Sequence, residues 1–81
     1  MLHSYTTSLE ANNDVFKKTC SAIERNITGI KKDELLTDVD GSAIQKYKVG
    51  SKEIVVQNDF EVDAVYVDSD IDLNGVIKSI V

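Results

Sequence analysis

Residues 43–57 read AIQKYKVGSKEIVVQ and carry the clearest structural signal in this chain of 81 residues. In the first half, Gln45, Tyr47 and Val49 alternate with one isoleucine and two lysines, as side chains do on the two faces of a strand. Gly50-Ser51 suits a two-residue hairpin loop with glycine first, the type II′ pattern. The β-branched run that follows is typical of a central strand. The stretch therefore predicts an antiparallel hairpin of strands 43–49 and 52–57.

An apolar stripe on the N-terminal side of this hairpin predicts a long helix. Its members recur at spacings of four, three, four and three residues: Phe16, Cys20, Ile23, Ile27 and Ile30. Leu9 extends the stripe, Ser8 suits the N-cap, and Gly29 suits the position just after the last helical residue. We therefore expect a helix over residues 8–29, preceded by a frayed terminus that contains His3.

The connection from this helix to the hairpin contains two local signals. Residues 33–36 favour a single helical turn after the break at Gly29. Residues 38–41 predict a turn, because Asp40-Gly41 supplies two residues that tolerate a positive φ.

A third strand is expected over residues 60–68, but its pattern changes phase. In its first part the apolar residues are at even-numbered positions, from Phe60 to Tyr66, and alternate with acids at 59, 61 and 63. In its second part they are at odd-numbered positions, from Val65 to Leu73, and the acids are at 68, 70 and 72. A flat strand would place Asp59, Glu61 and Asp63 on one face and Asp68, Asp70 and Asp72 on the other. A bulge near residues 64–66 would reunite the two triplets. Whether the acids form one patch or two is left open by the sequence.

The C-terminal segment fits two conformations. Asn74-Gly75 is a type I′ hairpin signal, and the β-branched residues after it favour a fourth strand. Leu73, Val76, Ile77 and Ile80 also have the i, i+3, i+4, i+7 spacing of a helix, in which Gly75 would cost about 1 kcal/mol. We favour the strand and keep a short helix as the alternative.

These elements predict one small α+β domain over residues 1–81. The expected fold is a long N-terminal helix packed on a small antiparallel sheet of three to four strands, in the order α-β-β-β-β. With no Trp in the chain, the expected core consists of Val, Ile and Leu together with four aromatic residues: Phe16, Tyr47, Phe60 and Tyr66.

Charge is divided unevenly along the chain. The net charge is −5, yet residues 1–52 carry 8 basic and 7 acidic side chains, whereas residues 53–81 carry 1 and 7. A concentrated acidic surface repels nucleic acid and attracts cationic surfaces, and it also keeps a small protein soluble. A double-stranded RNA-binding domain has a similar element order, but phosphate contact needs cations that the acidic third does not offer. We expect no direct binding to nucleic acid.

Catalytic and metal-binding patterns are incomplete. His3 is the sole histidine, and Cys20 lies on the apolar stripe, where a thiol is expected to be buried and inert. Asp68, Asp70 and Asp72 have the spacing of a calcium loop, but the positions that require Gly and Glu hold Leu73 and Ser79. We expect a protein that is not an enzyme, with no cofactor and no metal. Without a signal-peptide pattern or an apolar run of membrane-spanning length, the sequence indicates a cytoplasmic protein that does not contact membranes.

Two functional hypotheses remain. In the first, the chain is a protein-interaction module, for example an inhibitor or immunity-type protein. It would bind a basic partner through Asp59, Glu61, Asp63, Asp68, Asp70 and Asp72, and an extended ladder of carboxylates that mimics nucleic acid is its most specific form. In the second, the chain self-assembles as a homodimer, through the helical stripe or the C-terminal strand, and its acids serve only solubility.

Overall fold

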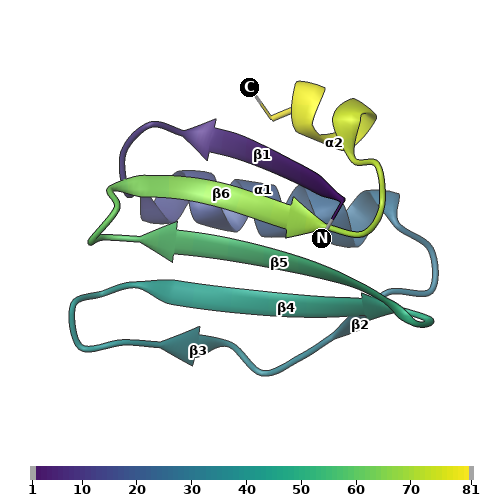
Figure 1. Ribbon diagram of the computed structural model, residues 1–81, viewed down its shortest axis with the longest axis horizontal. Helices are drawn as coiled ribbons and strands as arrows, with labels where there is room; N and C mark the ends of the chain where they lie inside the picture. Colours follow the sequence, from purple (N-terminus) through teal and green to yellow (C-terminus); the bar gives the residue numbers. More distant parts are fainter. Residues whose placement is uncertain (1, 81) are drawn as a thin grey trace.

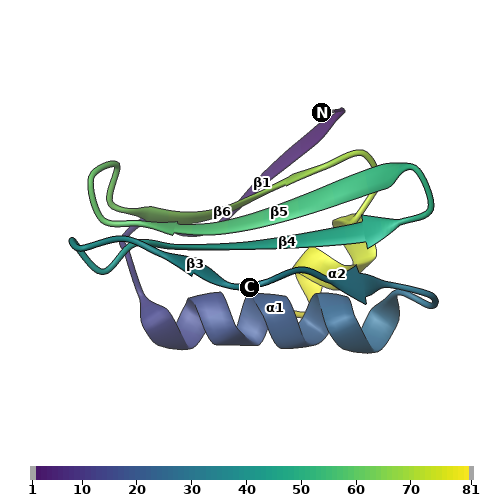
Figure 2. The same cartoon turned by 90° about the horizontal axis from the view of Figure 1, so that it is seen from below.

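The computed structural model describes residues 2–80 and shows an α+β fold with one antiparallel sheet and two helices on one of its faces (Figures 1 and 2). In chain order the elements are β1 (His3–Ser8), α1 (Asn13–Asn26), β2 (Lys31–Lys32), β3 (Leu36–Thr37), β4 (Ala43–Val49), β5 (Lys52–Asp59), β6 (Ala64–Ser69) and α2 (Asn74–Lys78). The strand order is β1-β6-β5-β4-β2, and β3 also pairs with β4. The sheet thus has six strands rather than the expected three to four.

The predicted hairpin is confirmed and forms the middle of the sheet. In β4 and β5, Val49 pairs with Lys52 across the loop Gly50-Ser51, and only the glycine of that loop has a positive φ, at 63°. The β-branched strand β5 is central, with β4 on one side and β6 on the other. Alternation along these strands directs one set of side chains toward the helices, and this set forms most of the core.

The core lies between the sheet and α1. The largest apolar side chains that are fully buried come from α1, β4, β5, β6 and the residue before α2: Ile23, Tyr47, Ile54, Val56, Val65, Val67 and Leu73. Phe16 and Cys20 also lie in this cluster, so the apolar stripe of the helix faces inward as expected. Buried polar groups are paired within the same layer. Asn58 accepts the Asn12 N–H at 3.0 Å and donates to Asn13 Oδ1 at 2.9 Å, which ties the start of α1 to β5.

The N-terminal prediction was wrong in its boundaries. Residues 3–8 form the edge strand β1, and the helix runs over residues 13–26 rather than 8–29. Asn12, not Ser8, is the N-cap, because its side chain accepts the N–H groups of Asp14 and Val15. The helix ends where the backbone of Ile27 becomes extended, two residues before Gly29. β1 consists mostly of polar residues, which suit a loop about as well as a strand, so the sequence did not reveal it as a strand.

The segment between α1 and the hairpin also differs from the prediction. Residues 33–36 do not form a helical turn. Two-residue strands, β2 and β3, instead run along the outer edge of β4, and between them the Asp33 N–H donates to the Lys46 carbonyl at 3.0 Å. The predicted turn over residues 38–41 is confirmed, with Gly41 at a φ of 93°.

The phase change in the third predicted strand is explained by a turn. β6 begins at Ala64 rather than residue 60, and residues 60–63 form the loop from β5, with Asp63 in the left-handed region at a φ of 62°. The bulge lies elsewhere, at Thr7 in β1. Phe60, expected in the core, is therefore a loop residue with 44% of its surface exposed.

The C-terminal segment forms the helix α2 rather than the favoured fourth strand. A strand that follows β6 by a tight hairpin would need the outer edge of β6, and β1 already pairs with that edge. The helical spacing instead lets Leu73 and Ile77 enter the core, where 1% and 8% of their surfaces are exposed.

Candidate functional site

Three connections between elements meet at one end of the molecule. They are residues 9–12 (β1 to α1), residues 38–42 (β3 to β4) and residues 60–63 (β5 to β6), and Figure 1 shows all three at the left-hand end of the sheet. Two contacts join them: the Ala11 N–H donates to Asp63 Oδ1 at 2.8 Å, and the Phe60 N–H donates to Ser42 Oγ at 3.0 Å. We call these residues, with Asp59 at the end of β5, the loop end.

Large apolar side chains are exposed at the loop end. Each connection contributes at least one of them: Leu9, Val39, Phe60 and Val62. Leu9 and Val39 are almost entirely free of contact with the rest of the chain, at 90% and 103% exposure. Clustered exposed apolar groups are typical of binding surfaces rather than of ordinary protein surface.

Carboxylates surround these apolar residues. The loop end contains six acidic residues and no lysine or arginine: Glu10, Asp38, Asp40, Asp59, Glu61 and Asp63. Four of these acids line one hollow of about 330 Å³ between the second and third connections: Asp38, Asp40, Asp59 and Glu61. The hollow shows that residues far apart in sequence form one acidic surface.

Several of these carboxylates also hold the turns in shape. Asp59 Oδ1 accepts the N–H groups of Glu61 and Val62, and Asp40 Oδ1 accepts the Ser42 N–H at 2.9 Å. The hydrogen bond from Ser42 lowers the pKa of Asp40 below its usual value, so this group is ionised at neutral pH. Glu10 and Glu61 differ from these residues, because no hydrogen bond to their side chains is found among residues 2–80.

Asp59 also affects a neighbouring phenol on the sheet. The Tyr66 hydroxyl lies 3.2 Å from Asp59 Oδ2 and 3.0 Å from Gln57 Oε1. Partial burial, and then the negative charge of Asp59, raise the pKa of Tyr66. Tyr66 therefore stays a neutral hydrogen-bond donor to Asp59 at the rim of the loop end.

The structure divides the six acids selected from the sequence into two groups. Asp59, Glu61 and Asp63 belong to the loop end, whereas Asp68, Asp70 and Asp72 follow β6 toward the opposite end of the sheet. Residues 64–67 of β6 lie between Asp63 and Asp68, which separates the two groups by about 16 Å of extended chain at 3.3 Å per residue. Neither group forms an extended ladder, since residues 60–63 turn back on themselves and only Asp68 of the second group lies in a strand.

The second group is held by three different parts of the chain. Asp68 accepts the Ser4 hydroxyl, Asp70 accepts the Glu53 N–H, and Asp72 accepts the Asn74 N–H. Their carboxylates thus serve separate local structures. Among residues 2–80, no group of three or more His, Cys, Asp or Glu side chains is arranged to hold a metal ion.

None of the acidic or exposed apolar residues of the first two connections was selected from the sequence as a binding residue: Leu9, Glu10, Asp38, Val39 and Asp40. Leu9 was assigned to the helical stripe, and the others lie about 20 or more residues before the third connection. The sequence contained one local signal for this site. Val39 is an apolar residue inside a predicted turn, and the side chains of turn residues are usually exposed. Their proximity to residues 59–63 depends on strand pairing, which the sequence does not show.

The sole cysteine lies in a groove between α1 and the β3–β4 edge. This groove of about 600 Å³ is lined by Phe16, Cys20, Leu35 and Gln45 among others. Burial raises the pKa of the Cys20 thiol, so it is a poor nucleophile at neutral pH. Tyr47 donates to Glu24 Oε2 at 2.6 Å, and Lys32 lies 3.4 Å from the same oxygen. Glu24 and Lys32 thus line the groove as a paired set.

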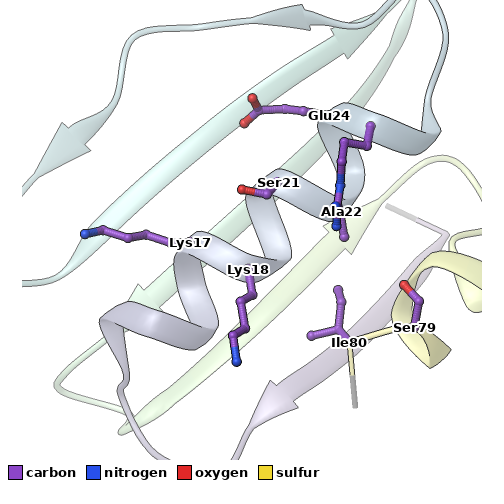
Figure 3. A pocket seen from close by; sticks show the side chains of 8 residues that line it. Lys17, Lys18, Ser21, Ala22, Glu24, Ser79 and Ile80 are labelled. Atoms are coloured by element: carbon purple, nitrogen blue, oxygen red, sulfur yellow. The ribbon is translucent and has the colours of Figure 1, made fainter.

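A second groove lies between α1 and the end of α2 (Figure 3). It is lined by Lys17, Lys18 and Arg25, which give it a positive charge. Figure 3 shows the side chains of Lys17 and Lys18 pointing in different directions from the helix, so they do not converge on one anion.

Within residues 2–80, no helix has the length and apolar character needed to cross a membrane.

Comparisons of the chain with protein-family models, with curated proteins and with solved structures gave no significant match.

Proposed function

We propose that the protein is a non-enzymatic interaction module that binds a basic protein partner through the loop end. The observation that supports this proposal is the combination of four exposed apolar side chains with six carboxylates on three connections that meet at one place. Apolar contact supplies the binding free energy, while the ring of negative charge speeds the approach of a cationic surface and orients it.

The loop end is held firmly, which favours binding. Asp59, Asp63 and Ser42 each accept a backbone N–H from a loop residue, so the three connections are ordered before a partner arrives. Pre-ordered loops lose less conformational entropy on binding than mobile ones. The partner surface that fits is an apolar pocket flanked by lysine or arginine, and an enzyme that binds nucleic acid through a cationic groove has that chemistry.

The test uses affinity capture from lysate of the source organism, with the wild-type chain and two sets of variants. Glu10→Lys with Glu61→Lys reverses charge at side chains that carry no turn hydrogen bond, and Leu9→Ser with Val62→Ser removes apolar contact. Matched controls lie outside the loop end: Glu34→Lys for charge and Leu2→Ser, at a residue 80% exposed, for apolar contact.

The expected result is a stoichiometric basic partner that both loop-end pairs lose and both controls keep. We expect each loop-end pair to weaken binding roughly tenfold or more, which corresponds to about 1.4 kcal/mol. High salt should reduce capture by the wild type, because surface charges are screened. A partner that binds all variants equally would show that the loop end is not the binding surface.

A further inference from the structure

One buried side chain in the groove between α1 and the β3–β4 edge has an acceptor without a donor. Gln45 of β4 has only 2% of its surface exposed. Its amide nitrogen donates to the carbonyls of Asp33, at 2.6 Å, and Lys46, at 3.2 Å. These two bonds fix which way the amide is turned, so the position of Oε1 is fixed as well. No N–H or O–H group within residues 2–80 donates to that oxygen.

Gln45 Oε1 reaches the groove rather than the packed core. Among the described residues, every fully buried side-chain nitrogen or oxygen atom has a hydrogen-bond partner. Because Oε1 has none, it keeps a small area open to solvent, and the groove of about 600 Å³ is the space that Gln45 lines. An acceptor with so little contact with water gains more from a ligand donor than a fully hydrated one does.

The walls beside this acceptor are largely apolar. Phe16 and Cys20 of α1 and Ala43 of β4 are each less than a tenth exposed, and they line the groove. Leu35, between β2 and β3, forms another part of the lining and is 48% exposed. An apolar group in the groove would shield Leu35 from water, which favours binding. The volume and this mixture of apolar walls with few polar groups are typical of sites for small organic molecules.

One cation at the groove has no counterion in the described chain. Lys17 lines the groove, and neither of the two ion pairs found among residues 2–80 includes it. Lys32 differs, because it pairs with Glu24 at 3.4 Å, and Tyr47 donates to the same carboxylate. Figure 3 shows Lys17 extending from α1 on the same side as Glu24 and away from Lys18. The ammonium group of Lys17 is therefore the charge in this groove that is available to an anion.

We propose that this groove binds a small aromatic carboxylate with an N–H or O–H donor on its ring. The donor bonds to Gln45 Oε1, the ring lies against the apolar walls, and the carboxylate approaches Lys17. A cationic ligand would be repelled by Lys17, and a hydrocarbon would cover Gln45 Oε1 without a hydrogen bond, which costs free energy. A ring suits the groove better than a flexible chain, because it loses less conformational entropy on binding.

The experiment uses indole-3-acetate as the probe, since it has a ring N–H, an aromatic body and a carboxylate. The chain contains no Trp, so the fluorescence of the indole can be followed selectively while the protein is titrated into the probe. We expect saturable binding to the wild type with a Kd of about 0.1–1 mM, the weak range that suits a groove open to solvent.

A change in the probe tests the hydrogen bond without altering the protein. 1-Methylindole-3-acetate lacks the ring N–H and should bind roughly tenfold more weakly, because Gln45 Oε1 is then covered without a donor. In Gln45→Met, which has no such acceptor, the two probes should bind with equal affinity. If that variant does not fold, the comparison of the two probes on the wild type decides the point alone.

Changes in the protein locate the probe. Lys17→Glu should weaken binding about threefold or more, whereas Lys18→Glu, the same change at the neighbouring residue, should leave it unchanged. Leu35→Ser should also weaken binding. Its control is Leu36→Ser, because Leu36 is exposed to the same extent, at 49%, and does not line the groove.

Three results would overturn the proposal. The first is the absence of a saturable change up to about 5 mM protein, well above the expected Kd. The second is equal binding of the two probes by the wild type, since Gln45 Oε1 would then not be the contact. The third is a loss of binding in Lys18→Glu but not in Lys17→Glu, which would place the probe in the groove between α1 and α2.

This site is independent of the proposed function at the loop end. Glu10→Lys with Glu61→Lys changes no residue of the groove, so this variant should bind indole-3-acetate like the wild type. A change in its affinity for the probe would count against the site. Loss of a protein partner and loss of the probe are therefore separate results.

Discussion

At the scale of single residues, Tyr47 shows how a side chain can be polar and still belong to the core. It has no exposed surface, and its hydroxyl donates to Glu24 Oε2 at 2.6 Å. The aromatic ring stabilises the core by burial, and the hydrogen bond removes the penalty of a buried hydroxyl. Burial, and then the acceptor Glu24, raise the pKa of Tyr47 far above its ordinary value.

This shift predicts a loss of stability in alkaline solution. Because the pKa in the folded state exceeds that in the unfolded chain, the folded state holds the proton more tightly. The corresponding stability is complete below the unfolded pKa of about 10 and decreases by up to about 1.4 kcal/mol per pH unit above it. We expect the free energy of unfolding, measured with urea between pH 8 and 11, to fall more steeply for the wild type than for Tyr47→Phe.

Two observations make that prediction specific to Tyr47. Tyr66→Phe is the matched control, because Tyr66 is only partly buried and should change the alkaline slope less. At pH 7, Tyr47→Phe should cost roughly 1 kcal/mol for the lost hydrogen bond. Equal slopes for the wild type and Tyr47→Phe would show that the Tyr47 hydroxyl ionises in the folded protein as readily as in the unfolded chain.

At the scale of elements, two glycines predict substitutions of opposite sign. Gly50 occupies the β4–β5 hairpin at a φ of 63°, which L side chains rarely adopt, whereas Gly75 lies in α2 without a positive φ. A methyl group at either position would meet nothing within 4 Å, so backbone conformation alone decides the outcome. Gly50→Ala should destabilise the fold by about 1 kcal/mol, and Gly75→Ala should stabilise it by about 0.5–1 kcal/mol.

Chemical denaturation of the two alanine variants checks this pair of predictions under one set of conditions. Each variant is the control for the other, since both add the same methyl group on open surface. A stabilising Gly50→Ala would contradict the positive φ of the hairpin loop. A destabilising Gly75→Ala would contradict the helical conformation of the C-terminal segment.

The elements that could be predicted from sequence are those with local signals. The β4–β5 hairpin has alternation and a glycine loop, and the turn at residues 38–41 has Asp40-Gly41; both are confirmed. The edge strand β1 and the short strands β2 and β3 lack such signals, since they form by pairing with β6 and β4. The C-terminal strand was predicted wrongly because β1 was not recognised as a strand. Without β1, the outer edge of β6 was free to pair with the predicted strand.

The candidate site follows the same rule. Asp59, Glu61 and Asp63 could be selected from composition, because they are close in sequence. Their combination with Leu9 and Val39 could not be, since it arises from the sheet order, which brings three separate connections to one end. The two surfaces first considered for self-assembly are used inside the fold: the helical stripe packs in the core, and the C-terminal residues form α2.

At the scale of the whole molecule, the loop end has a rigid support. Its second connection leads into β4, and its third connection joins β5 to β6. β5 pairs with a neighbour on both sides over most of its length. α2 is different, since it has five residues and no side-chain N-cap. The molecule should therefore have a stable centre and a C-terminal helix that opens on its own.

Native-state hydrogen exchange tests this division of stability. The N–H groups of Val55 and Val56 should exchange only through global unfolding, while that of Ile77, bonded to the Leu73 carbonyl at 2.9 Å, should exchange through local opening of α2. We expect protection at Ile77 to be roughly hundredfold lower, which corresponds to about 2.7 kcal/mol. Gly75→Ala should slow exchange at Ile77 by more than it slows exchange at Val56, because the added methyl group stabilises the helix itself. Equal protection at Ile77 and Val56 would instead show that α2 and the sheet unfold as one unit, and opening of α2 would then also disrupt the support of the loop end.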